Sequence, residues 1–494
     1  MANPSATKPN AHAQEKGSHR FAVPRPILII LAVYFCVFFA MAVRKFVVMN
    51  SDEELGVTLN AFWNTIHGRL FYSPYVGMSL LGLHTCFAAL IGLPLFWLFP
   101  SMYTLLFLQS FTLTVSGYVF YLIARKVHQD ERTALLLMVG FLFYPTIVTN
   151  HTDTFPWEQW ALPYLLAAFY FFISERFWPF LVFAFLGMTG QENLPLTIGM
   201  FGVYALVKRR NWRWIIVPIV MALVYGLFAF KVVIPHFAGA RGYIVSRYFG
   251  DLGNTPGELV KTAITQPWRI IAAMCQADRV MYLVMILQPF LFLIPFCAWE
   301  VLFVLPSLGI NLFVSESAFR VIAWHYNLIV GSFLYVAAVF GIKNLSGWLE
   351  RRWHVVQPQF VLALAICTVS IASWPLWFNA SMYTTHAYYP TLQKVLEIIP
   401  PNKSLLTPLT MLGHFSDRES ALTQFQFDPT QPLNEIRPLD EMYKLDYIIL
   451  DANERRFPKA IVTRDLVMSF YTNVNYELIL NESNVFVFRR RTAE

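Results

Sequence analysis

The chain has 494 residues, of which 56% are hydrophobic, 17% aromatic and only 14% charged. Its mean hydropathy of +0.49 is far above that of water-soluble domains, which excludes a soluble globular protein and predicts one that crosses a membrane several times. The formal net charge of +7 is typical of basic cytoplasmic loops in such a protein, so we predict no nucleic-acid partner.

The first predicted element is a polar, basic tail at residues 1–25, followed by an apolar run at 26–43. A membrane span preceded by positive charge is oriented with that charge in the cytoplasm. No small-residue cleavage site follows the run, so we predict a retained first span and a cytoplasmic N-terminus.

Helix length predicts the remaining spans, because a crossing requires about 20 mostly apolar residues. The apolar segment 86–99 is shorter and contains Pro94, and we predict that it is embedded without crossing. With this choice the basic loops fall on the cytoplasmic side. The roughly eleven predicted spans are 26–43, 102–124, 133–149, 159–174, 177–190, 194–207, 214–235, 279–296, 299–314, 326–342 and 359–377. They form a transmembrane domain at 26–378, with a first outer loop at 44–101.

From residue 379 charged and polar residues return, and the apolar runs shrink to the length of strands. The sequence 391–400 has helical spacing, 404–409 and 446–451 are typical of buried strands, and 476–490 predicts a hairpin. We therefore expect a small α/β domain at 379–494. An odd number of crossings places it outside the cytoplasm.

Three consecutive carboxylates, Asp52, Glu53 and Glu54, follow the first span. Ser51 and Glu54 have the spacing of a capping box, in which the serine begins a helix and the glutamate reaches back to it. The helix that follows is amphipathic and suits the outer membrane interface. A second interpretation is that one carboxylate faces a cavity and accepts a proton from a hydroxyl group. The sequence leaves both open.

Glu192 lies between two short apolar spans, with Gln191 and Asn193 beside it. A carboxylate at the centre of a bilayer costs up to about 2.5–3.5 kcal/mol, so such residues usually face the protein interior and serve a function. The alternative is a solvated loop tip. His151, Asp153 and Glu158 are predicted on the same outer side.

Candidate anion-binding residues follow in the outer loops. Arg241, Arg247 and Tyr248 lie in a glycine-rich loop, where a guanidinium could hold a phosphate with two hydrogen bonds or contact lipid head groups. Arg320 and His325 come just before the tenth span, and a histidine there is either a packed residue or part of an anion site.

These features together resemble the polyprenyl-phosphate-dependent (GT-C type) glycosyltransferases. More closely, the chain resembles the membrane protein family defined as domain of unknown function 2079 (DUF2079), mainly over residues 50–345. The segments that carry the resemblance are ELGVTLNAFWNTIHG, LLGLHTCFAALIGLPLFWLFPSMYTLLFLQ, FYPTIVTNHTDTFPWEQWALP, KVVIPHF, SRYFGDLG and WHYN.

The resemblance implies a GT-C-like, all-α membrane domain, and it points to site residues position by position. These are Glu54, where the family usually has Asp, and His84, Glu192, Arg247, Tyr248 and His325. The chain departs from the family pattern at Leu59, Asn60, Pro156, Gln191 and Asn193. We predict no metal-ligand set from the residues, and the resemblance leaves a divalent cation, Mg or Mn, as an optional cofactor.

We therefore expect a multi-pass glycosyltransferase of the plasma (inner) membrane. It would move a sugar from a polyprenyl-phosphate carrier to a glycan, lipid or protein acceptor on the extracytoplasmic face. Glu54, or Asp52 if Glu54 is used in the cap, would act as general base, with Glu192 also in the catalytic group. Arg241, Arg247, Tyr248, Arg320, His325 and His84 would bind the substrate and its phosphate. The alternatives are a transporter or lipid flippase, and a catalytically inactive scaffold.

Overall fold

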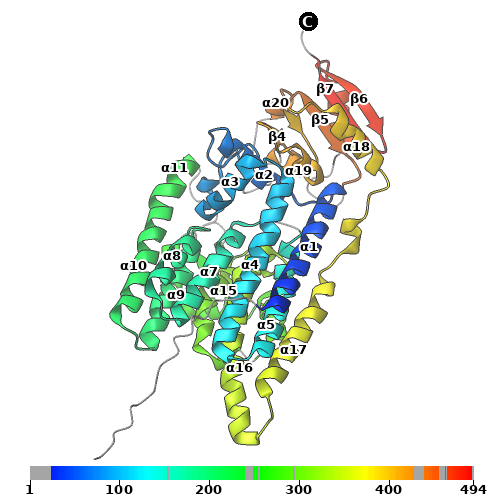
Figure 1. Cartoon of the computed structure of the whole chain (residues 1–494). Helices are drawn as coiled ribbons and strands as arrows, with labels where there is room; N and C mark the ends of the chain where they lie inside the picture. The colour runs from blue at the N-terminus through cyan, green and yellow to red at the C-terminus, as the bar shows by residue number, and fades with distance from the viewer. Residues whose placement is uncertain are drawn as a thin grey trace, which may run out of the picture.

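The structure is a computed structural model. It describes residues 24–152, 155–239, 249–250, 252–253, 256–292, 295–427, 439–454, 462 and 464–491. A long helical bundle carries a small sheet at one end (Figure 1). We call this end of the bundle the sheet side.

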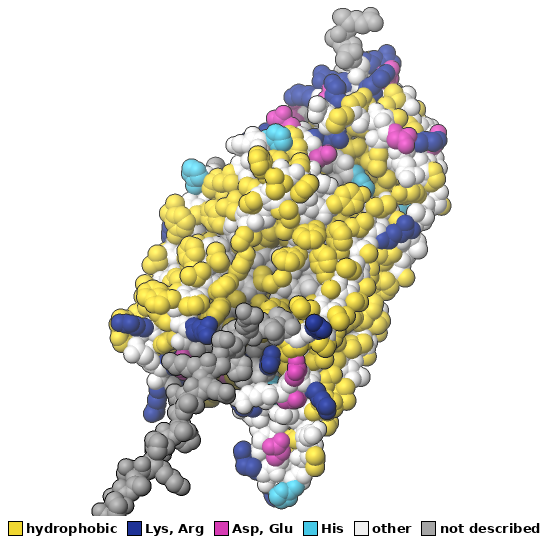
Figure 2. Space-filling model, viewed as in Figure 1, with side chains coloured by type: hydrophobic (Ala, Val, Ile, Leu, Met, Phe, Trp, Pro, Cys, Tyr) yellow, Lys and Arg dark blue, Asp and Glu magenta, His cyan; other side chains and the backbone are white. Residues whose placement is uncertain are grey.

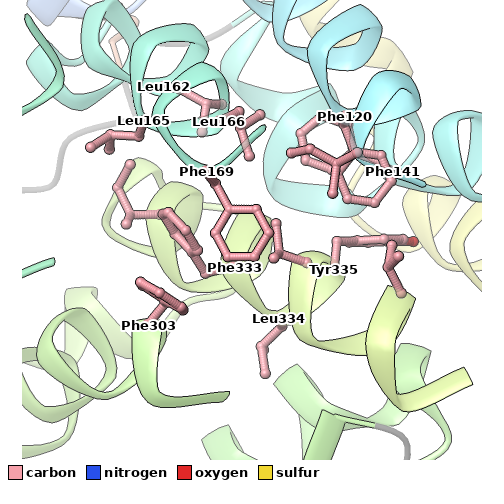
Figure 3. Packing of buried hydrophobic residues seen from close by; sticks show 14 of the residues in the cluster. Phe120, Phe141, Leu162, Leu165, Leu166, Phe169, Phe303, Phe333, Leu334 and Tyr335 are labelled. Carbon is pink, nitrogen blue, oxygen red and sulfur yellow. The ribbon is translucent and has the colours of Figure 1, made fainter. Parts of the chain in front are cut away.

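The bundle is built around a large core of buried aromatic and aliphatic residues. Phe169 lies at its centre, with its ring edge-on to Phe303 and Phe333, while Phe120 stacks on Phe141 (Figure 3). The bundle helices are α1 (Arg25–Val47), α4 (Met102–His128), α5 (Glu131–Leu142), α6 (Pro145–Asn150), α7 (Trp157–Ile173), α8 (Phe177–Met188), α9 (Leu194–Val207), α10 (Trp212–Phe228), α11 (Ile234–Ala238), α12 (Pro256–Thr265), α13 (Pro267–Met274), α14 (Ala277–Leu287), α15 (Leu305–Phe313), α16 (Leu328–Trp353) and α17 (Pro358–Ser373).

Five helical segments in the described chain are long and apolar enough to cross a membrane, or up to six if one bent pair is counted as a span. The five are Arg25–Val47, Met102–His128, Trp212–Ala238, His325–Trp353 and Pro358–Leu376. Shorter apolar helices, among them α8 and α9, coincide with other predicted crossings but are shorter than these five. The bundle is therefore that of a membrane protein, whereas the predicted count of eleven crossings stays a prediction.

Three predicted spans, 133–149, 279–296 and 299–314, are not single helices. The first divides into α5 and α6, with Pro145 at the start of α6. Helix α14 ends at Leu287, and short 3-10 turns lead to α15, which begins at Leu305. Pro289, Pro295 and Pro306 explain the breaks, because proline lacks the amide that a helix interior requires. For the same reason the segment 86–99 divides into a 3-10 helix, Phe87–Gly92, and α3 (Leu93–Leu98).

Basic residues gather at the end of the bundle opposite the sheet. Arg25 begins α1 there, Arg125 and Lys126 end α4, and Arg351 and Arg352 end α16. A broad hydrophobic band separates this end from the charged surface of the sheet (Figure 2). The band is the surface expected of a membrane protein.

The sheet has five strands in the order β4-β3-β5-β7-β6. Strands β4 (Ala421–Leu422), β3 (Leu405–Leu406) and β5 (Tyr447–Asp451) are parallel, and β5, β7 (Val485–Arg490) and β6 (Tyr476–Glu482) are antiparallel. Ser483 and Asn484 connect β6 to β7 with φ angles of 51° and 60°, as a tight two-residue hairpin turn requires. Helices α18 (Tyr389–Ile398), α19 (Leu412–Phe415), α20 (Leu439–Met442) and α21 (Arg464–Tyr471) complete this part of the chain.

Helix α2 (Glu53–Ile66) lies between the bundle and the α19 turn. A Cβ atom at Gly56 would come within 2.7 Å of Leu412 Cγ, so only glycine allows this close approach. The amide of Asn60 donates hydrogen bonds to the carbonyls of Ser416 at 3.0 Å and Arg418 at 2.8 Å. We call the part of the chain from α18 to β7 the sheet domain. It covers the predicted interfacial helix and fixes it on that face.

Candidate active site

A cavity of about 1090 Å³ opens beside the start of α2. Its polar wall comes from α2, the segment around His84, the first turn of α7 and the residues before α9. Its apolar wall comes from α9, α10 and α15. One cavity therefore joins a group of ionisable side chains to a long hydrophobic surface.

The start of α2 decides which of the three consecutive acids faces this cavity. Asp52, not Ser51, is the N-cap, and its carboxylate accepts a hydrogen bond from the Glu54 amide at 3.2 Å. The predicted capping box is therefore wrong, because the helix begins one residue later and the aspartate satisfies the amide of its second residue. Glu53 and Glu54 are left free of the cap and both line the cavity.

His84 and Glu192 form the second part of the polar wall. The Nδ1 atom of His84 lies 3.0 Å from one oxygen of Glu192, and the Thr85 amide donates to the other at 3.3 Å. The Gln191 amide nitrogen lies 3.4 Å from the same imidazole. Glu192 is only 4% exposed, so it is a buried carboxylate that fixes the His84 ring and not a solvated loop tip.

His325 and Glu158 complete the group. His325 Nδ1 lies 3.8 Å from a carboxylate oxygen of Glu54, and its side chain is 13% exposed. Glu158 lies in the first turn of α7 and is buried beside the cavity. Helices α2, α7 and α9 all begin here with an acid at or just before their first turn, a position that the helix dipole favours for negative charge.

The surroundings change the acidity of these groups. Burial, and then the negative charge of Asp52, raise the pKa of Glu54 to about 8. Burial and Asp52 also raise the pKa of Glu53 well above its ordinary value. Burial lowers the pKa of His84, but Glu192, Glu158 and Glu54 outweigh it, and the net pKa is raised. The raised pKa favours the charged form of His84, and a pKa of about 8 suits Glu54 to exchange a proton.

Three helical glycines widen the apolar wall. A Cβ atom at Gly309 would meet nothing within 4 Å, and one at Gly226 would reach only Pro195 Cβ at 4.0 Å. Gly199 would gain one contact, with Ala222 Cβ at 3.7 Å. None of the three glycines is needed for close packing of neighbouring helices. Each one nevertheless weakens its helix by about 1 kcal/mol relative to alanine. Their missing side chains enlarge the cavity.

The sequence-predicted residues are placed as follows. Glu54, His84, Glu192 and His325 line the cavity together. Asp52 caps α2 beside it, and Arg241, Arg247 and Tyr248 lie outside the described residues.

Arg320 is predicted to bind the substrate, but it is not among the described residues that line the cavity. Its guanidinium Nε lies 2.8 Å from Asp278, and its NH1 donates to the Val314 carbonyl at 2.6 Å. These partners occupy the guanidinium in this structure.

Several residues that line the cavity are not among the catalytic and substrate-binding residues predicted from the sequence: Glu53, Thr58, Tyr75, Glu158 and Asn311. Thr58 carries a detectable signal, since it stands four residues after Glu54 and so shares its helix face. Glu158 carries another, as an acid just after Pro156 at a helix start. Within the described residues no group of three or more His, Cys, Asp or Glu is arranged to hold a metal ion.

The chain matches the family model described as "Predicted membrane protein (DUF2079)" over residues 48–487. It belongs to the DUF2079 family. The predicted resemblance to DUF2079 is thereby confirmed, over a longer part of the chain than its motifs cover. A search of curated proteins gave no match for this DUF2079 member.

Solved structures show the fold of this DUF2079 protein. ArnT from Cupriavidus metallidurans bound to undecaprenyl phosphate is 10% identical, with a TM-score of 0.52 over 94% of this chain and 98% of that chain. ArnT in the apo state is 11% identical, with a TM-score of 0.52 over 92% and 98%. ArnT has the GT-C fold, and the predicted GT-C-like architecture of the membrane domain is thereby confirmed.

Proposed function

We propose that this protein is a membrane glycosyltransferase that moves a sugar from a polyprenyl-phosphate carrier to an acceptor hydroxyl group. The observation that carries the proposal is the single cavity in which Glu54 and the two histidines meet a long apolar surface. A sugar-bearing lipid requires both parts, a polar region for the head group and a hydrophobic one for the chain.

Glu54 is the proposed general base. Its side chain is 44% exposed and lines the cavity, and its carboxylate is not used in the helix cap. A raised pKa suits a base that takes a proton near the operating pH. His84, whose pKa is raised beside Glu192, is proposed to stabilise the negative charge of the departing phosphate. Burial lowers the pKa of His325, so we propose that it acts there as a neutral hydrogen-bond donor.

The apolar wall between α9, α10 and α15 is the proposed binding surface for the lipid chain. Its lining is aliphatic and aromatic, including Leu223, Leu227 and Phe230 of the α10 region and Ile310 of α15. The ArnT structure that contains undecaprenyl phosphate supports a polyprenyl phosphate as the class of lipid. Because no metal-ligand group occurs among the described residues, we derive no step through a divalent cation.

We further propose that the cavity opens to the extracytoplasmic side of the plasma (inner) membrane. The support is the cluster of basic helix ends opposite the sheet, which the positive-inside rule assigns to the cytoplasm. This orientation places the sheet domain and the start of α2 outside.

The experiment is a transfer assay with protein reconstituted into liposomes. A panel of undecaprenyl-phosphate-linked sugars is supplied with an extract of envelope acceptors, and release of undecaprenyl phosphate is measured by mass spectrometry. Glu54→Gln keeps the size of the side chain but cannot accept the proton, so we expect release to fall by a factor of about 100 or more. Glu316→Gln, at an exposed acid outside the cavity lining, is the control. Equal release by Glu54→Gln and the unchanged protein would remove Glu54 from the proposed role.

A further inference from the structure

The position of His325 depends on its backbone. Its imidazole ring contacts the Tyr326 ring at a centroid distance of 4.1 Å and lies 3.8 Å from Glu54, but it makes no hydrogen bond to the described residues. The segment that carries it, residues 314–327, joins α15 to α16 through two short 3-10 turns. We call it the His325 segment. Whatever fixes this segment also places the imidazole in the cavity.

Side-chain donors fix the backbone carbonyls of the His325 segment. The Asn327 amide donates a hydrogen bond to the Val321 carbonyl at 2.8 Å. Asn311 of α15 donates to the Tyr326 carbonyl at 3.0 Å. Two more carbonyls accept hydrogen bonds from threonines of α6, Ile322 from Thr146 and Ala323 from Thr149. The backbone on both sides of the histidine is therefore tied to the bundle.

Asn327 is the centre of this arrangement and is fully buried. Its side-chain oxygen accepts hydrogen bonds from the Tyr282 hydroxyl group at 2.7 Å and the Asn311 amide at 3.2 Å. Its nitrogen donates to the Val321 carbonyl and, at 3.3 Å, to the Phe319 carbonyl. A side-chain amide has two donor hydrogens and two acceptor positions, so the bonding capacity of Asn327 is fully used.

Asn327 does not cap the helix that it begins. It occupies the N-cap position of α16, but its side chain makes no hydrogen bond to the first amides of that helix. An asparagine at this position usually accepts such a bond and stabilises its helix. The side chain is instead turned toward the His325 segment, Tyr282 and Asn311. Helix capping therefore does not explain why an asparagine stands here.

Arg320 holds the beginning of the same segment. Its NH1 group donates to the Val314 carbonyl at 2.6 Å and to the Asn311 carbonyl at 3.3 Å. Its Nε lies 2.8 Å from a carboxylate oxygen of Asp278, in the first turn of α14. The residue that the sequence predicts to bind substrate thus supports the backbone that carries His325.

We propose that Asn327 is a positioning residue for His325. With Tyr282 and Asn311, it fixes the His325 segment so that the imidazole stays beside Glu54 in the cavity. This inference rests on the proposed function, in which His325 donates a hydrogen bond to the departing phosphate. Asn327 and Tyr282 are not among the described residues that line the cavity, so they act through His325 and not on the substrate. The competing explanation is that the network only stabilises the fold, as buried hydrogen bonds generally do.

Two identical substitutions separate positioning from stability. Tyr282→Phe removes the hydroxyl group that donates to Asn327 and keeps the ring. Tyr335→Phe, the matched control, removes a similarly buried hydroxyl group that hydrogen-bonds to Ser370 and is not part of the described cavity lining. Both should lower the melting temperature slightly, because each loses a buried hydrogen bond. Asn327→Ala is the stronger variant, and Tyr282→Phe decides the test if that variant fails to fold.

The first readout is the reactivity of His325 toward diethyl pyrocarbonate, measured by peptide mass spectrometry on the full chain in lipid nanodiscs. The His325 side chain is 13% exposed, so the unchanged protein should be modified slowly. Tyr282→Phe and Asn327→Ala should raise this rate by about threefold or more, because a loosened segment opens the ring to the reagent. Tyr335→Phe should leave the rate unchanged. His84 is the internal reference in every sample.

The second readout is the kinetics of undecaprenyl phosphate release. Tyr282→Phe should lower kcat by about tenfold with little change in KM for the lipid-linked sugar, because His325 acts on charge that develops in the transition state. Tyr335→Phe should change neither constant. A network that only stabilises the fold predicts equal kinetics for two variants of equal melting temperature.

Equal His325 reactivity in all three variants would overturn the proposal. A raised reactivity with unchanged kcat would overturn it as well, because His325 would then be held without serving the transfer. The labelling needs no turnover, so raised reactivity in a protein that releases no undecaprenyl phosphate supports the positioning of His325 and contradicts only the proposed function. Turnover with equal reactivity contradicts only this inference.

Discussion

At the scale of single residues, neighbouring acids of one short stretch have different tasks. Asp52 adopts an extended backbone conformation, with φ of −77° and ψ of 153°, and turns its carboxylate toward the Glu54 amide. Glu54, already inside the helix, projects into the cavity. The Asp52 charge is nevertheless close enough to oppose ionisation of Glu54.

Asp52→Asn should separate the role of Asp52 as the N-cap of α2 from the effect of its negative charge on Glu54. Asparagine caps helices about as well as aspartate, so the melting temperature should change little. Removing the negative charge should lower the pKa of Glu54 below about 8. The base is active when deprotonated, so transfer should fall as pH decreases through the pKa, and this fall should begin at lower pH in the variant. The measurement is the pH profile of undecaprenyl phosphate release.

Asp52→Ala serves as the contrast. It removes both the charge and the cap, and it should cost about 0.5–2 kcal/mol of stability. A pH profile of Asp52→Asn that coincides with that of the unchanged protein would contradict the electrostatic coupling of Asp52 to Glu54.

At the scale of elements, the apolar wall depends on helices whose glycines leave space. Gly226 lies on α10 beside the lining residues Leu223 and Leu227. Val224, on the same helix, is 61% exposed and is not part of the lining. One helix therefore presents a cavity face and an outer face, and the two can be tested separately.

Gly226→Phe should fill part of the proposed lipid groove. We expect the affinity for undecaprenyl phosphate to fall by about tenfold or more, because the added ring occupies the volume of the chain. Val224→Phe adds a ring to the same helix on its exposed face and should leave the affinity unchanged. Binding is measured in nanodiscs with native mass spectrometry. Similar affinities in the two variants would place the lipid chain elsewhere.

At the scale of the whole molecule, the sheet domain holds the helix that carries Glu54. Arg44 donates to the Tyr383 carbonyl at 3.0 Å, and the His386 imidazole lies 2.7 Å from the Asn50 side-chain oxygen. Asn60 and Gly56 fix the far face of α2 on the α19 turn. The two parts of the chain thus share an interface next to the cavity.

Asn60→Ala should loosen this interface. The variant leaves the buried carbonyls of Ser416 and Arg418 without a donor, which should cost about 1–3 kcal/mol. Arg69→Gln removes an exposed ion pair with Glu419 in the same interface and should cost no more than about 1 kcal/mol. The measurement is proteolysis of the sheet domain as a function of urea concentration. Equal sensitivity of the two variants would show that Asn60 does not hold the domains together.

The proposed orientation is tested by cysteine labelling in a chain whose native cysteines are replaced by alanine. Val474 near the sheet is 80% exposed, and Val356 between α16 and α17 is 81% exposed. In intact cells, a membrane-impermeant maleimide should label Val474→Cys but should label Val356→Cys only after permeabilisation, because positive charge favours the cytoplasm. The reverse pattern would place the cavity on the cytoplasmic side.

The sequence alone determines the apolar helices and the sheet hairpin of this protein. Hydropathy and turn residues are local properties, so the starts of α1, α4 and α17 and the β6–β7 turn can be predicted within a few residues. The breaks around α14 and α15 follow from prolines inside apolar runs. Judged by length alone, these runs are predicted as uninterrupted spans.

Only the tertiary structure decides which polar residues meet. His84 and Glu192 are 108 positions apart, yet their side chains lie 3.0 Å from each other. Glu158 joins them because α7 begins at the same cavity as α2 and α9. Local sequence shows that an acid begins each helix, but the direction in which its side chain points depends on how distant helices pack. The cap at Asp52 and the cavity-facing position of Glu54 are therefore properties of the folded chain.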